Sequence, residues 1–247
     1  MTGVQTCALP ILDTKLAQAM ILHHATPRKL AEYAQQGAEE EKRVEQLLAD
    51  TPMMMRMLVA DGPMWGKYGP AMEIYEAIQK ASDRANDGIL ERLALAVAIE
   101  HAVPIKQSHP EAITDGPEYI DPIERYLSFE KAYLDGELDP SFKNQSVWNL
   151  RMVVTSTTSN ETFAWGREMI RNYRPDLTKI SMSAGRYEKI VQKDIRYSSK
   201  DVHKDRPELE WAQNVLDNGG ICGRHAGFGR FILRAHGVPT TNRPQKG

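Results

Sequence analysis

Signals that start helices recur along the first two thirds of this chain, and they constrain its fold more than any other feature. Thr26-Pro27 and Thr51-Pro52 each place a capping residue before a proline at the first helical position. Asp121-Pro122 repeats the arrangement, and Thr158-Ser159-Asn160-Glu161 has the capping-box pattern. The sequence therefore predicts helices almost throughout residues 12–174, which we interpret as a helical domain.

Apolar residues recur at helical spacing between these signals. One such stripe is formed by Leu90, Leu93, Ala94, Val97 and His101. No repeat with the period of a helical array is present, so we do not expect a peptide-binding solenoid. The chain has 247 residues, of which 41% are hydrophobic and 26% charged, as in an ordinary globular protein.

Charge and hydropathy limit the partners of the chain. The net charge is −2 and no basic stripe stands out, so we expect no nucleic-acid partner. No run approaches the roughly 18 apolar residues of a membrane span, so we expect none.

Residues 1–11, MTGVQTCALPI, resemble a translated sequencing adapter, which we exclude from fold reasoning and which points to a metagenomic fragment. We expect the native N-terminus and any signal peptide to be missing, so the localisation is unknown. Cys7 belongs to this segment, which leaves Cys222 as the only authentic cysteine. One thiol predicts neither an internal disulfide nor a thiolate metal site, and we expect no metal or cofactor.

The helical pattern ends near Pro175, and we place the start of a second domain, residues 175–247, at this point. A short strand is predicted over 189–197, and a helix over 207–216 that carries Trp211. Another helix is predicted from Cys222 to Ala235, with Gly237 as its stop.

The most informative motif is Asn218-Gly219-Gly220-Ile221-Cys222-Gly223. Gly219, Gly220 and Gly223 allow a tight turn and a close approach of the backbone to a substrate. The sulfur of Cys222 would then sit at a helix N-terminus, where N–H groups and the dipole favour a thiolate. We interpret Cys222 as a nucleophile, in preference to a small buried cysteine.

This segment, followed by a helix and His236-Gly237-Val238-Pro239-Thr240, resembles the nucleophile helix of the transglutaminase-like superfamily, which has a papain-like cysteine fold. The likeness is strongest to bacterial members with a helical N-terminal region. It implies a chain that is mainly α: a helical region plus the truncated first part of an α+β core. In that family the helix packs on an antiparallel sheet. We expect that sheet to lie mostly beyond residue 247, so that apolar residues of the helix are exposed.

The resemblance implies a Cys-His-Asp triad that cleaves or transfers peptide or protein amides. Cys222 is the catalytic residue, Trp211 lines the cleft, and the histidine and aspartate would follow residue 247. We therefore expect the fragment to be inactive, with a peptide or protein substrate for its parent and an unknown oligomeric state. The alternative is a transglutaminase-like module that binds or supports without catalysis.

The internal histidines suit other roles. His225 lies three residues after Cys222 on the same helix face, which is not the geometry of the family, so we expect a surface role. His236 precedes the stop at Gly237 and is expected to interact with the helix C-terminus.

Overall fold

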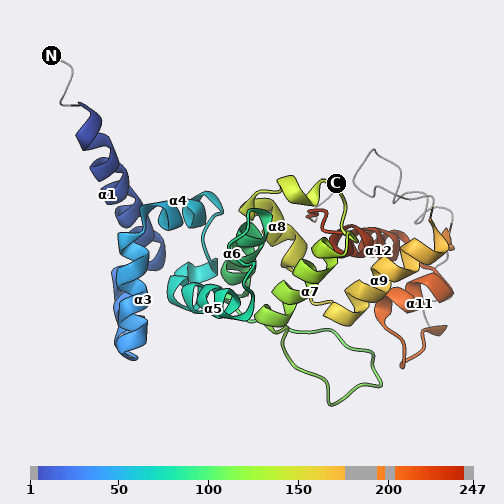
Figure 1. The fold of residues 1–247 in the computed structure, drawn as a ribbon. Helices are drawn as coiled ribbons and strands as arrows, with labels where there is room; N and C mark the ends of the chain where they lie inside the picture. Colours follow the sequence, from blue (N-terminus) through green and yellow to red (C-terminus); the bar gives the residue numbers. More distant parts are fainter. Residues whose placement is uncertain (1–4, 176–193, 198–203, 242–247) are drawn as a thin grey trace. The chain divides into compact units, whose positions relative to one another are not determined.

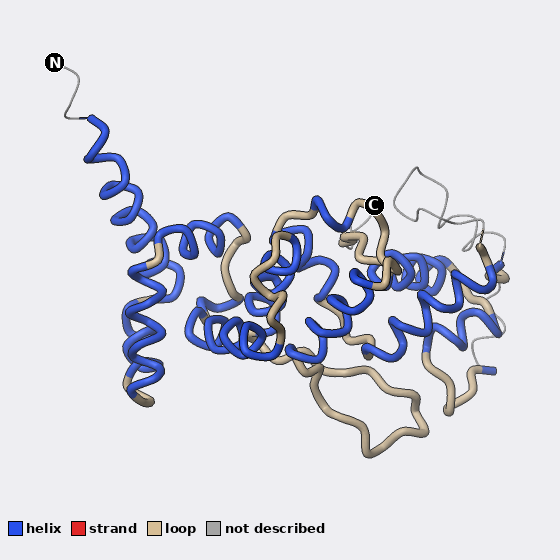
Figure 2. Tube along the Cα trace, viewed as in Figure 1, coloured by secondary structure: helices blue, strands red, loops and turns tan. Residues whose placement is uncertain are grey.

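The computed structural model describes residues 5–175, 194–197 and 204–241, and most of this part is helical (Figures 1 and 2). Within these ranges the structure contains no strand, only isolated bridges from Lys106 to Tyr119 and from Tyr197 to Gly220. The prediction of a mainly α chain is confirmed. The transglutaminase-like core stays a prediction.

The chain divides into two compact units. The first unit comprises Met1–Pro104 and Ser146–Arg151, and the second comprises Ile105–Gln145 and Met152–Gly247. The sequence-based boundary at residue 175 does not coincide with this division. The helices on either side of that boundary lie in the same unit.

The first unit is a set of short helices joined by tight turns. They are α1 (Gln5–Ala25), α2 (Pro27–Ala34), α3 (Ala38–Ala49), α4 (Thr51–Val59), η1 (Met64–Gly66), α5 (Tyr68–Ala81) and α6 (Ile89–His101). Helix α6 is buried along almost its whole length and packs on α5. Arg151 lies within the same unit and binds Glu100 at 2.9 Å and the Gly62 carbonyl at 2.9 Å.

The second unit holds α7 (Pro122–Leu134), η2 (Phe142–Asn144), α9 (Asn160–Tyr173), α11 (Trp211–Asn218) and α12 (Cys222–Ala235). Helix α8 (Val147–Val154) contributes its first residues to the first unit and its last to the second. Helix α12 packs on both α9 and α11, and α9 also packs on α7.

An aromatic core joins α9 to α12. The Phe231 ring stacks on Phe163, with centroids 6.0 Å apart, and a Cβ at Gly166 would lie 2.6 Å from Phe231. Phe228 and Ile232 are also buried. The expectation of an exposed apolar face on this helix is therefore wrong, because α9 and α11 supply the packing that we assigned to a sheet.

Most helix starts lie where the sequence places them. The side chains of Thr26 and Asp121 cap α2 and α7 as predicted, accepting hydrogen bonds from backbone N–H groups. Two caps are shifted by one residue: Asp50, rather than Thr51, caps α4, and Ser159, rather than Thr158, caps α9.

Three further predictions concern residues 1–11, the strand over 189–197 and the absence of a membrane span. Helix α1 begins at Gln5, inside the segment that we assign to an adapter, and that assignment stays a prediction. Most of the predicted strand over 189–197 lies outside the described residues, although Tyr197 pairs with Gly220. Among the described helices, none is both long and apolar enough to cross a membrane.

Candidate functional site

The turn between α11 and α12 depends on Gly219. This residue has φ 74°, and a Cβ on it would lie 2.0 Å from the carbonyl oxygen of Arg196. The next N–H, that of Gly220, donates to the same oxygen at 3.0 Å. The turn is thus pressed against residues 196–197, and only glycine fits there without a shift of the backbone.

Arg224 braces the same turn from inside. Its buried guanidinium binds both carboxylate oxygens of Asp205, at 2.9 to 3.1 Å, and Asn218 donates to Asp205 at 3.0 Å. A Cβ on Gly220 would lie 2.4 Å from the Arg224 side chain, so this glycine makes room for the arginine. Sequence reasoning missed Asp205 because it lies 19 residues before Arg224.

Cys222 is the first residue of α12, and its thiol is exposed. The N-cap is Ile221, which provides no side-chain cap. The first N–H groups of a helix have no acceptor within the helix, so the positive end of α12 lies at the residue that carries the sulfur. Gly223 follows, and a Cβ there would meet no atom within 4 Å. Steric packing therefore does not require this third glycine.

The histidines on α12 contact other groups. The His225 ring meets Tyr197 edge to face at 5.3 Å, and its Nε2 lies 3.4 Å from the Arg196 carbonyl. His236 is buried, and its Nδ1 donates to the Ile232 carbonyl at 2.8 Å. Burial lowers the pKa of His236, so the ring is held neutral at the helix end rather than as the cation that a dipole interaction favours.

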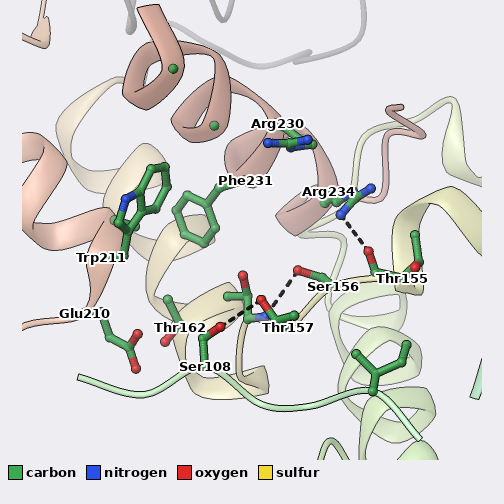
Figure 3. Close-up of a pocket in the computed structure, with 15 residues that line it drawn as sticks. Ser108, Thr155, Ser156, Thr157, Thr162, Glu210, Trp211, Arg230, Phe231 and Arg234 are labelled. Atoms are coloured by element: carbon green, nitrogen blue, oxygen red, sulfur yellow. Dashed lines mark hydrogen bonds between the residues drawn. The ribbon is translucent and has the colours of Figure 1, made fainter. Parts of the chain in front are cut away.

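A cavity of about 480 Å³ lies beside α12 in the second unit (Figure 3). Gly223 and Gly227 line it, together with Trp211 at the start of α11. The Trp211 indole rests against α12 where a Cβ on Gly227 would lie 2.7 Å away. The structure thus brings Trp211 and Gly223 to one cavity, whereas Cys222, Gly219 and Gly220 are not among its lining residues.

The rest of the cavity was not predicted. It is lined by hydroxyl-bearing residues and by charged and aromatic side chains: Ser108, Thr155, Ser156, Thr157, Thr158, Thr162, Glu210, Arg230, Phe231 and Arg234. The run Thr155-Ser156-Thr157-Thr158-Ser159 was a visible signal, since five consecutive hydroxyl residues stand out in the sequence.

No group of three or more metal-binding side chains occurs among the residues that the structure describes. No protein-family model matches the chain, and no curated protein and no solved structure is significantly similar to it.

Proposed function

We propose that Cys222 is the nucleophile of a cysteine-dependent amidase, peptidase or acyltransferase acting on peptide or protein amides. The observation that supports the proposal is the position of its thiol. The sulfur is exposed at the first residue of α12, after a glycine turn that Arg224 and Asp205 hold in place.

In the proposed reaction the Cys222 thiolate attacks the carbonyl carbon of an amide and forms a tetrahedral intermediate. Backbone N–H groups at the start of α12 stabilise its oxyanion. A histidine transfers a proton to the leaving amine, the C–N bond breaks, and a thioester remains. Water then releases an acid, or an amine takes the acyl group. In this proposal the histidine and its orienting aspartate lie on strands that follow residue 247.

The test uses the protein encoded by the native locus, read through codon 247 and beyond. The proposal expects a Gly-His-Ala or similar segment on the next strand and an aspartate one strand later. Activity is measured as release of ammonia and of new α-amino groups from casein, and as incorporation of a fluorescent primary amine into it. Replacing Cys222 by Ala should lower every rate that the parent protein shows by at least about 1,000-fold.

Arg171→Gln is the control, because Arg171 lies on α9 and pairs with Glu137 rather than with a residue of the glycine turn. This variant should keep the full rate. A locus without a histidine on that strand, or a Cys222→Ala protein as active as the parent, would show the proposal to be wrong.

A non-catalytic binding module is the second candidate. It is favoured by the cavity beside α12, since Cys222 is not among the residues that line it. In a binding module, Cys222→Ala would leave ligand affinity unchanged, whereas changes to the cavity lining would lower it.

A further inference from the structure

The cavity beside α12 is built from three stretches of the second unit that lie far apart in sequence. Ser108 comes from the segment after α6, Thr155–Thr162 from the connection between α8 and α9 and the first turn of α9, and Glu210–Arg234 from α11 with its N-cap and from α12. Hydrogen bonds join the first two stretches: the Ser108 N–H donates to the Thr157 carbonyl at 2.7 Å, and its hydroxyl donates to Thr157 Oγ1 at 2.8 Å. The opening is thus a defined feature of the folded unit.

One side of the cavity is cationic. Arg230 and Arg234 lie four residues apart on α12 and therefore on the same helix face, and both line the cavity (Figure 3). Arg234 is fixed by two carbonyl oxygens, that of Thr155 at 2.6 Å and that of Thr240 at 3.2 Å. These two contacts hold the guanidinium at the wall of the cavity.

A third guanidinium lies next to the hydroxyl-rich segment. Arg125 is fully buried, its Nη2 donates to the Thr158 carbonyl at 2.5 Å, and its guanidinium carbon lies 4.9 Å from the centre of the Phe163 ring. Two of its nitrogens, Nε and Nη1, have no hydrogen-bond partner in the described structure. Burial lowers the pKa of Arg125 to about 9, and repulsion from Arg234 contributes, whereas Glu161 opposes the shift.

Glu210 is the one carboxylate that lines the cavity within the described residues, and it is already engaged. It caps α11 by accepting from the backbone N–H of Gln213, and the Thr162 hydroxyl donates to it. Its charge is thus directed at the start of α11. Among the described residues that line the cavity, two arginines therefore stand against one carboxylate.

The remaining walls suit the body of an organic molecule. Trp211 is 45% exposed and lines the cavity, so part of a rigid indole surface is available for contact with a ring. Ser156, Thr157 and Thr158 add hydroxyl groups, which can donate as well as accept. A volume of about 480 Å³ is in the range of small-molecule sites.

We propose that this cavity binds a small organic anion. A carboxylate or phosphate head group lies against Arg230 and the hydroxyl groups of residues 156–158, and a planar body stacks on Trp211. The proposal does not depend on Cys222 being a nucleophile, because the thiol is not among the lining residues.

The test measures binding to the full chain by the shift of the Trp211 indole N–H in ¹⁵N-edited NMR, assigned with Trp211→Phe. The probes are phenyl phosphate, benzoate, benzyl alcohol and inorganic phosphate. The two ring-bearing anions should shift the indole signal and bind at least about tenfold more tightly than benzyl alcohol, because the alcohol cannot accept a charge-assisted hydrogen bond. The ratio of the phenyl phosphate and benzoate affinities identifies the preferred head group. Inorganic phosphate should bind more weakly than phenyl phosphate, since it cannot stack.

Arg230→Gln should weaken phenyl phosphate binding by about tenfold or more, as expected for a lost charge-assisted contact. Arg171→Gln is the control, because Arg171 pairs with Glu137 outside the cavity. A second measurement needs no variant: raising NaCl from about 0.05 to about 0.5 M should weaken the anions but not benzyl alcohol. Equal binding of benzyl alcohol, an unmoved Trp211 signal, or salt-independent affinity would overturn the proposal.

Discussion

At the scale of single residues, the structure requires glycine at some positions around Cys222 and not at others. Gly219 needs its positive φ and has no room for a Cβ, whereas Gly223 faces open space. The sequence motif alone does not distinguish the two glycines. In the structure, the turn requires glycine at position 219, whereas a larger side chain would fit at position 223.

Replacing Gly219 by Ala should lower the free energy of unfolding by at least about 2 kcal/mol, because a strained φ and a backbone clash add together. Gly223→Ala is the matched control and should raise the stability by about 0.5–1 kcal/mol, since alanine favours a helix over glycine. Urea unfolding followed by circular dichroism measures both. A Gly219→Ala protein as stable as the parent would contradict the account of the turn.

His236 links stability to pH. Burial lowers its pKa in the folded state below the ordinary 6.5, so the unfolded chain takes up a proton first as the pH falls. The stability that His236 contributes is present above about pH 6.5 and is lost as the pH falls further toward its folded pKa. One such group gives a slope of at most about 1.4 kcal/mol per pH unit. In His236→Gln, the loss of stability between about pH 7.5 and about pH 5.5 should be smaller than in the parent protein. Unfolding curves that fall equally with pH in both proteins would refute this role.

At the scale of elements, helix starts were the most predictable feature. Capping depends on residues within one turn of each other, so Thr26 and Asp121 could be read from the sequence. At α4 and α9 the cap is the neighbouring polar residue, Asp50 or Ser159, whose side chain accepts from the backbone N–H three residues later. The helix from Cys222 to Ala235 was predicted with its bounds, since Gly237 ends it with φ 74°.

The join between α11 and α12 depends instead on a contact that the sequence does not reveal. Asp205→Asn should lower the free energy of unfolding by about 1–3 kcal/mol, because it leaves the guanidinium of Arg224 buried without a counter-charge. Asp217→Asn is the control: its pair with Arg206 spans 3.3 Å between side chains more than half exposed, so the change should stay within about 0.5 kcal/mol. Equal effects of the two substitutions on chemical unfolding would remove the bracing role of Asp205.

At the scale of the whole chain, the sequence indicated a mainly helical protein and the position of Cys222 at the start of a helix. It could not indicate the division into units, because contacts between α9 and α12 join residues on both sides of the predicted boundary. The cavity was equally out of reach. Trp211 was singled out, but the hydroxyl residues and arginines opposite it are brought near only by tertiary packing.

The cavity is not formed by any one continuous segment of the chain. Its lining residues come from three separated stretches, 105–108, 155–162 and 210–234. No short peptide cut from the protein can reproduce it. A molecule that occupies it holds the three stretches together, and its binding energy is added to the stability of the second unit as a whole. Binding to the cavity and folding of the unit are therefore linked equilibria: a ligand raises the free energy of unfolding, and unfolding of the unit releases the ligand.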